Sequence, residues 1–444
     1  MKKSAFTITT SLLLGALVFA GGCCGKKKQG CAARPDGAKA AAVVPHIGTN
    51  ALAVIYQDYA KSGRSTAVTA FTALLERKQR EFNAAVLEAG GTNTYPEAVR
   101  KYTEMTADEM FRFIYGVDRS ELKWHVGVLE KFSPDIFDDE VAGEITLPNF
   151  YSASYSAKPL DLDRAVKAGE EIRKAFIASD PALSNAFSTI AEVISAERFE
   201  SEGTCAFRIS VCNPVTKEKL GGVAPVVTTL CDGHLVVLAS SEGTLEKVRG
   251  LYAGKEPEAP ADSAIARELD LPANVLFRLA VPELGKFLAD IEKDEDDDDD
   301  KDGKDDGEDD DGEFKPEDVK SFRLELAVDD ASTNLFFRAA AELSKEEIAQ
   351  MAVDEVSKGV SSATTMLPML ALAKPELSFL APLVQGVTAS RSGGTAAVGI
   401  SIAYATLEAV DAKALARLAA EAEALKGALP AGGGSDDDDE NIFE

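Results

Sequence analysis

Residues that enzymes commonly use for catalysis or metal binding are scarce in this chain. It has three histidines, six cysteines and one tryptophan among 444 residues. It contains no zinc-protease, nucleophile-elbow, phosphate-loop or dinucleotide-binding motif. The histidines are expected in a linker (His46), on an outer strand face (His125) and at a turn (His234). The sequence therefore favours a non-catalytic protein without a cofactor, although a carboxylate pair assembled only by the fold would leave no motif.

Negative charge outweighs positive charge in this chain, with 74 Asp or Glu against 47 Lys or Arg. The formal net charge is -27, and most of it lies in two acidic tracts. Residues 292–313 hold sixteen Asp or Glu against three Lys, and residues 435–444 hold six acids and no base, which leaves -8 for the remainder. Because no basic stripe is present, nucleic acid is excluded as an expected partner.

A short apolar run near the N-terminus, residues 12–19, follows two lysines. Residues 1–22 thus have the parts of a secretory signal peptide. Ala-Gly-Gly-Cys at residues 20–23 resembles the lipobox of bacterial lipoproteins, in which Cys23 becomes the lipidated first residue, although leucine is usual where Ala20 stands. Two alternatives are cleavage after Ala20, which would release a secreted protein, and an uncleaved span, for which the run is short.

The residues after the signal, 23–45, are small, basic and rich in alanine, which predicts a flexible tether. Lys26, Lys27 and Lys28 would lie against anionic head groups and add about 1 kcal/mol each to membrane binding. Their simpler role is to keep the tether soluble. We therefore expect an exported chain, anchored to a membrane of the cell envelope on its periplasmic or outer side.

The length predicts two domains, since 444 residues exceed one ordinary core. In the first, residues 46–255, apolar side chains at spacings of three, four and seven predict a helix over residues 68–86. Alternation over residues 122–128 predicts a strand, and Asp232-Gly233 predicts a tight hairpin turn with positive φ at both residues. Helices are also predicted over residues 161–195, and strands over 204–212, 223–231 and 234–240.

The second domain, residues 262–428, repeats this mixture of hairpins and helices, with an acidic insertion at 292–313. Ser344 and Glu347 have the spacing of a capping box, which predicts a helix running to about Val360. Strands are predicted over residues 274–281, 322–328, 335–339 and 398–404.

The expected fold class is α+β, with two similar domains of antiparallel sheet packed by amphipathic helices. The repeated order of elements favours a duplication with a break near residues 256–261. After the second domain, residues 429–444 are expected to form an acidic disordered tail.

The second half, together with residues 232–245, resembles a broad group of uncharacterised bacterial envelope lipoproteins with a duplicated α+β architecture. In that group an apolar strand after a tight turn runs into a helix opened by small and acidic residues, and a strand like residues 274–281 follows. The likeness covers residues 225–425. It implies the fold and an envelope location, and it implies no activity.

The acidic insertion has the spacing of a calcium-binding loop, which resembles the loops of EF-hands and thrombospondin-like repeats. Calcium requires several hard oxygen ligands, and Gly303 would allow a tight turn around the ion. The candidate ligands are Asp298, Asp300, Asp302, Asp306 and Asp309. A solvated, self-repelling loop is the alternative, because Asp305 stands where an EF-hand loop has an apolar residue and so acidic a tract meets the spacing by chance.

If the strand at 204–212 pairs antiparallel with the strand at 223–231, Cys205 lies opposite Cys231. Adjacent-strand disulfides are feasible at that separation, and an exported protein meets an oxidising compartment. The alternative is that Cys205, Cys212 and Cys231 are buried thiols. A zinc site formed by these cysteines with His234 is disfavoured, because the paired C-x-x-C spacing is absent.

Together these observations predict a non-catalytic cell-envelope lipoprotein whose body binds an envelope protein or glycan. One alternative is a secreted or anchored hydrolase with an active site that motifs do not reveal. The other is a carrier of lipids or small ligands, which would need an apolar cavity between sheet and helices.

Overall fold

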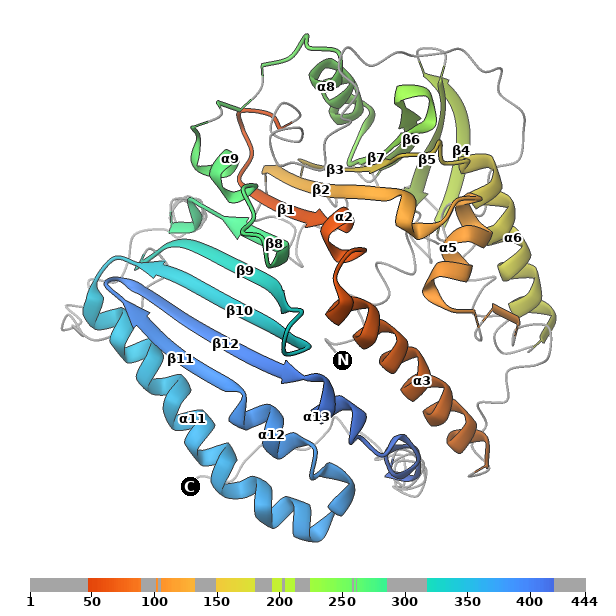
Figure 1. Ribbon diagram of the computed structural model, residues 1–444. Helices are drawn as coiled ribbons and strands as arrows, with labels where there is room; N and C mark the ends of the chain where they lie inside the picture. The colour runs from red at the N-terminus through yellow and green to blue at the C-terminus, as the bar shows by residue number, and fades with distance from the viewer. Residues whose placement is uncertain are drawn as a thin grey trace, which may run out of the picture.

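A computed structural model describes most of the folded body. The described residues are 47–88, 101–102, 105–131, 149–179, 194–201, 204–211, 224–257, 259–260, 262–285 and 318–418. Within them, a single antiparallel sheet of twelve strands runs through the molecule, with helices packed on it (Figure 1). The predicted α+β class is confirmed.

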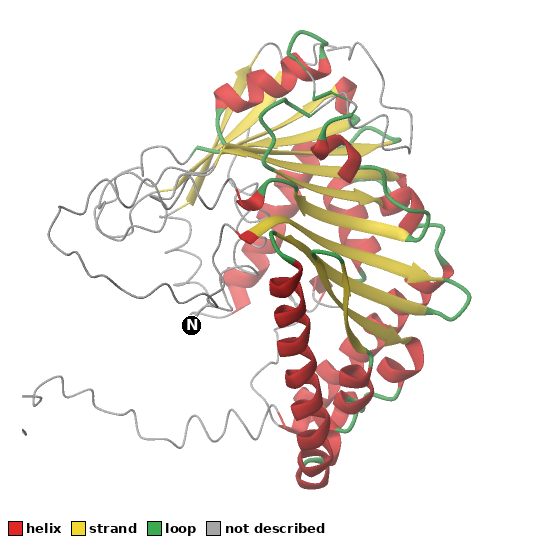
Figure 2. Cartoon of the chain, turned by 90° about the vertical axis from the view of Figure 1, so that its left-hand side faces the viewer, coloured by secondary structure: helices red, strands yellow, loops and turns green. Residues whose placement is uncertain are grey.

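The strands are arranged in the order β11-β12-β10-β9-β8-β1-β2-β3-β7-β6-β5-β4. The first-half strands are β1 (Ala53–Asp58), β2 (Leu122–Lys131), β3 (Asn149–Ser156), β7 (Leu235–Ala239), β6 (Val226–Leu230), β5 (Thr204–Val211) and β4 (Ile194–Ser201). The second-half strands are β8 (Val275–Val281), β9 (Val319–Asp329), β10 (Asn334–Leu343), β12 (Thr395–Ala403) and β11 (Val387–Ser392). Figure 2 shows how the sheet twists along its length.

The strand order is nearly symmetrical about the central β1–β8 pair. Going outward from β1, the sheet adds β2, β3 and the hairpin β7-β6; going outward from β8, it adds β9, β10 and the hairpin β12-β11. The first half then carries one extra hairpin, β5-β4. This order supports the duplication hypothesis.

The two halves nevertheless share their sheet. Tyr56 on β1 lies directly opposite Arg278 on β8. Ala259, in the segment predicted to separate two domains, belongs to the same buried cluster as the first-half strands, and so do Leu269 and Leu271 of the predicted second domain. A division into two separate domains is therefore not confirmed.

Helices cover both faces of the sheet. They are α2 (Tyr59–Ser62), α3 (Thr66–Glu88), α5 (Ala107–Tyr115), α6 (Leu162–Ser179), α8 (Glu242–Tyr252), α9 (Ala264–Glu268), α11 (Glu346–Ala373), α12 (Leu380–Gln385) and α13 (Tyr404–Glu408). Within the described residues there are also short 3-10 turns, namely η3 (Arg119–Glu121), η5 (Cys231–Gly233) and η7 (Pro375–Leu377). In Figure 1, α8 and α9 lie on one side of the first-half strands and α5 and α6 on the other. α3 packs against β9, β10 and α13, and α11 runs along β11 and β12.

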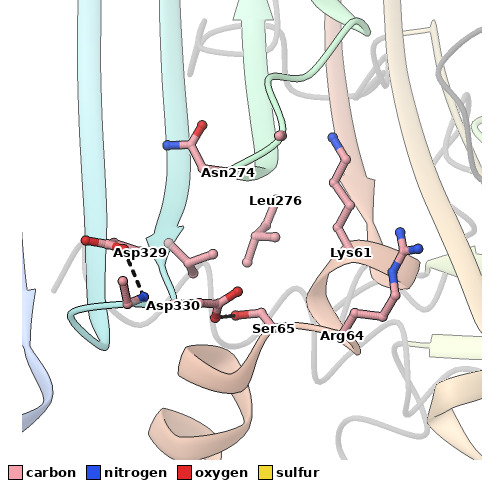
Figure 3. A pocket seen from close by; sticks show the side chains of 10 residues that line it. Lys61, Arg64, Ser65, Asn274, Leu276, Asp329 and Asp330 are labelled. Atoms are coloured by element: carbon pink, nitrogen blue, oxygen red, sulfur yellow. Dashed lines mark hydrogen bonds between the residues drawn. The ribbon is translucent and has the colours of Figure 1, made fainter.

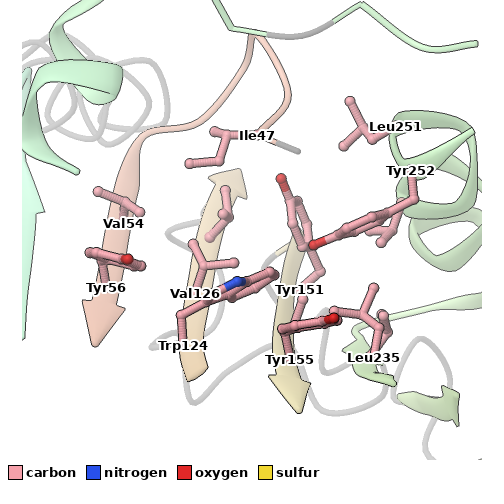
Figure 4. Close-up of a cluster of buried hydrophobic side chains, with 14 of the residues drawn as sticks. Ile47, Val54, Tyr56, Trp124, Val126, Tyr151, Tyr155, Leu235, Leu251 and Tyr252 are labelled. Carbon is pink, nitrogen blue, oxygen red and sulfur yellow. The ribbon is translucent and has the colours of Figure 1, made fainter. Parts of the chain in front are cut away.

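The main core lies between the first-half strands and helices α8 and α9 (Figure 4). The alternation predicted over residues 122–128 is confirmed, because Trp124, Val126 and Val128 are all buried in this core. Trp124 stacks on Tyr155 with their ring centroids 5.8 Å apart. Apolar side chains of such size supply most of the favourable free energy of folding.

The buried clusters under the second-half strands are smaller. Under α11 the cluster consists of Leu343, Ile348, Ala349 and Ala396, with partly buried neighbours. The first turns of α11 pack on this cluster, and the helix also contacts α12 and η7.

Several predicted boundaries differ from the structure. The capping box is wrong: α11 begins after Lys345, and the Ser344 hydroxyl instead donates to the Asp318 carboxylate. α11 also continues past Val360 to Ala373.

The first half differs from the prediction in two places. Helix α6 ends at Ser179, and β4 occupies Ile194–Ser201, where helix was predicted to continue to residue 195. The positive φ predicted at Asp232 and Gly233 is confirmed, but the predicted two-residue turn is wrong. Leu230 pairs with Leu235, so four residues connect β6 and β7, and Cys231 also has a positive φ.

Candidate functional site

Most residues predicted to carry function lie outside the described residues. These are the lipidation site Cys23, the calcium candidates of the acidic insertion, and Cys212. Both the lipid anchor and the calcium loop therefore remain predictions.

The predicted disulfide between Cys205 and Cys231 is wrong. Phe207 pairs with Val227, which places Cys205 level with Thr229. Cys231 lies past the end of β6, in the turn η5, with φ of 54°. Cys231 is disulfide-bonded, whereas Cys205 is not, and the Cys205 sulfur accepts a hydrogen bond from Arg198 Nε at 2.8 Å. The prediction failed because it assumed a register two residues away from the real one.

The zinc alternative gains no support from the described part of the chain, which contains no cluster of three or more potential metal ligands. His234 instead donates from Nδ1 to the backbone carbonyl of Ser156 at 2.9 Å, and its ring stacks near that of Tyr155. The residue has a structural role at the hairpin.

His125 and Ser154 form a polar pair in the middle of the sheet. They lie opposite each other on β2 and β3, both half-buried, and His125 Nδ1 is 2.8 Å from Ser154 Oγ. Burial lowers the pKa of His125 to about 4, so the ring is neutral at pH 7. The sequence predicted the correct strand face for His125, but strand alternation does not reveal how far that face is covered.

A cavity of about 420 Å³ lies where the two halves meet (Figure 3). Leu276 and Val328 supply its apolar part, and its polar rim comes from the turn before α3 and from the end of β9. The lining residues with charged or polar side chains are Lys61, Arg64, Ser65, Asn274, Asp329 and Asp330.

The charged groups of this cavity are largely committed to structural contacts. Asp330 accepts hydrogen bonds from Ser65 Oγ at 2.6 Å and from the Ala67 N–H at 2.9 Å, and these bonds lower its pKa. A carboxylate at the start of α3 is stabilised by the helix dipole. Lys61 Nζ donates to the Leu271 carbonyl at 3.0 Å. The polar contacts around the cavity therefore hold the start of α3 against the end of β9, across the boundary of the halves.

The most unusual surface belongs to the last turns of α11. Four large apolar side chains are exposed there, and we call them the apolar end of α11: Met366 (66% exposed), Met369 (73%), Leu370 (41%) and Leu372 (85%). Helices that are apolar on every side are normally buried. Among the described residues, no helix combines the length and apolarity needed to cross a bilayer. This surface was not predicted, because the predicted helix ended near Val360.

Comparisons with known proteins give no family assignment. No protein-family model matches the chain, and no curated protein matches it in sequence. One solved structure similar to the chain is reported as "Structure of crystal form IV of TP0453", with 8% identity, a TM-score of 0.31, and coverage of 85% of this chain and 95% of that chain. A likeness at that TM-score carries no functional argument.

Proposed function

We propose that this chain is a non-catalytic lipoprotein of the cell envelope whose body contacts a partner through the apolar end of α11. The N-terminal sequence supports the anchor: a signal peptide, then small residues before Cys23. The exposed side chains of Met366, Met369 and Leu372 are the observation that carries the contact role. An envelope protein, a glycan or the membrane itself would be the partner, and nucleic acid would not.

Exposed apolar clusters mark interaction surfaces. A single exposed leucine is ordinary, but a contiguous group of large apolar side chains on a soluble body generally marks a contact with protein or membrane. Leu372 is 85% exposed, and Met369, one turn away, is 73% exposed. Exposure of these apolar side chains to water is unfavourable in free energy, so a partner that covers them would gain binding free energy.

The hydrolase alternative finds weaker support. A hydrolase requires a nucleophile, a base and oxyanion donors that converge on open space. His125 and Ser154 are hydrogen-bonded, but a pKa of about 4 makes His125 a weak base. The carrier alternative requires an apolar cavity, and the described core under α8 is filled by aromatic side chains such as Trp124 and Tyr151.

The anchor is tested by acyl labelling in cells that process lipoproteins. The wild-type chain should incorporate labelled fatty acid and sediment with membranes, and Cys23→Ala should lose the label. Cys24→Ala is the matched control and should keep it. Equal labelling of the Cys23→Ala chain would contradict the lipoprotein assignment.

The contact surface is tested by mild peroxide oxidation of methionines, read by mass spectrometry. Met351, which is 49% exposed near the start of the same helix, is an internal reference for Met369. In native envelopes the ratio of Met369 to Met351 oxidation should fall below the ratio in soluble Cys23→Ala chain. An unchanged ratio would exclude a partner at the apolar end of α11.

A further inference from the structure

We infer that the partner of the apolar end of α11 is the lipid bilayer itself, with this end inserted at the acyl boundary of one leaflet. The inference rests on the proposed envelope location and names lipid as the occupant of that surface. Three features of the helix favour lipid over a protein partner.

The first feature is the distribution of charge along α11. The first part of the helix carries Glu347, Asp354, Glu355 and Lys358, whereas the fifteen residues 359–373 contain no charged side chain. Over the whole chain, 27% of residues are charged. Hydrocarbon penalises every buried charge, while a protein interface usually keeps a charged or polar rim. A long uncharged stretch that is also exposed matches a lipid contact.

The second feature is how two hydroxyl groups of this stretch, those of Thr364 and Thr365, are satisfied. Thr364 Oγ1 donates to the Val360 carbonyl at 2.8 Å, and Thr365 Oγ1 donates to the Ser361 carbonyl at 3.0 Å. The helix therefore provides partners for these hydroxyl groups itself. Polar side chains whose hydrogen bonds are made within their own helix can leave water at low cost.

The third feature is the composition and shape of the helix end. Pro368 lies inside α11, a position that soluble helices disfavour and membrane helices tolerate. Residues 359–373 span about 22 Å as a helix, which is less than the roughly 30 Å of a bilayer core. After Ala373 the chain turns back through η7 into α12. This end lies past the ends of β11 and β12 (Figures 1 and 2), where a flat membrane would meet it first.

Tryptophan fluorescence on vesicles tests the inference with the full chain. The only tryptophan, Trp124, is fully buried and gives a constant background. Met369→Trp adds an emitter at the apolar end of α11, and Met351→Trp is the matched control on the charged part of the same helix. The vesicles contain phosphatidylethanolamine and phosphatidylglycerol, with or without brominated acyl chains, and flotation reports how much chain is bound.

On brominated vesicles the added emission of the Met369→Trp chain should fall roughly twofold and shift to the blue, because the apolar face of an interfacial helix lies within the acyl boundary. The Met351→Trp chain should float equally well and be unaffected. If both variants float and neither is quenched, the anchor survives and the lipid contact is refuted. If neither floats at millimolar lipid, the apolar end does not hold a membrane and the inference fails as well. A blue shift without lipid that grows with protein concentration would assign this surface to a second copy of the chain.

Discussion

The two halves of the sheet use their apolar residues in opposite ways. Under the first-half strands, large side chains such as Trp124, Tyr151 and Leu235 are buried almost completely between the sheet and α8. In the second half, the buried cluster under α11 is small, and α11 carries most of the large apolar side chains that the described residues expose.

This contrast suggests that the two halves have different roles. Burial of large apolar side chains stabilises a fold, whereas leaving them exposed makes sense only if a partner covers them. The first half would therefore supply most of the stability of the body, and the second half would supply its contact surface. Substitutions in the two halves should separate these roles.

The largest effect is expected in the first-half core. Trp124→Ala should lower the free energy of unfolding by about 5 kcal/mol, because it removes a fully buried indole and leaves a cavity. Leu372→Ala in the apolar end of α11 should change it by less than about 0.5 kcal/mol. Urea unfolding followed by circular dichroism gives both values. Comparable losses of unfolding free energy from the two substitutions would show that the two halves do not differ in this way.

The boundary between the halves should be the next most sensitive place. Arg278 is buried on β8, where it forms ion pairs with Glu325 at 2.6 Å and Glu268 at 3.5 Å. Arg278→Ala removes the buried cation paired with Glu325, while Glu268 keeps its pair with Arg323, and should cost about 3 kcal/mol in urea unfolding. Arg323→Ala is the control: Arg323 also pairs with Glu268 but is 44% exposed, so its loss should cost less than about 1 kcal/mol.

A pH effect should come from His125 in the first half. Its folded pKa of about 4 lies below the ordinary value of 6.5, so the unfolded chain takes up the proton first as the pH falls. The stability contributed by the neutral ring is complete above pH 6.5 and is lost as the pH falls towards 4.

Between pH 7 and pH 5 the wild-type chain should therefore lose about 2 kcal/mol more unfolding free energy than His125→Gln, which does not titrate. Parallel urea titrations at the two pH values measure the difference. Identical pH dependence of the two chains would show that His125 is not shielded as the structure indicates.

The smallest effect is expected at the cavity between the halves. Asp330→Asn removes the charge that Ser65 and the Ala67 N–H hold at the start of α3. Hydrogen exchange of the first turn of α3 should become faster. Asp329→Asn, which alters only the contacts of Asp329 with its own turn, should leave that exchange unchanged. Equal effects would mean that the carboxylate of Asp330 does not fasten α3 to β9.

Local periodicity predicted many of the elements. The spacing over residues 68–86 anticipated α3, and the alternation over residues 122–128 anticipated the buried face of β2. In each case a core imposes a repeat of 3.6 or 2 residues on a continuous segment.

Other features depend on long-range packing, which the sequence pattern did not reveal. No strand was predicted over Asn149–Ser156, although β3 alternates tyrosine and alanine with serine; its place between β2 and β7 depends on pairings that the local pattern does not give. The β5–β6 register, and with it the cysteine pairing, depends on contacts between strands far apart in sequence. The apolar end of α11 was not predicted because the predicted helix ended near Val360, whereas α11 continues through Pro368 to Ala373.

The central claim is that the first half stabilises the body while the apolar end of α11 contacts the membrane. Hydrogen–deuterium exchange of the wild-type chain, with and without vesicles of phosphatidylethanolamine and phosphatidylglycerol, tests it most directly. Without lipid, exchange should be slowest in β1, β2, β3 and β7 and faster in α11. With lipid, slowing should be confined to residues 359–385. Unchanged exchange in that segment, or lipid-dependent slowing in the first-half strands instead, would contradict the account.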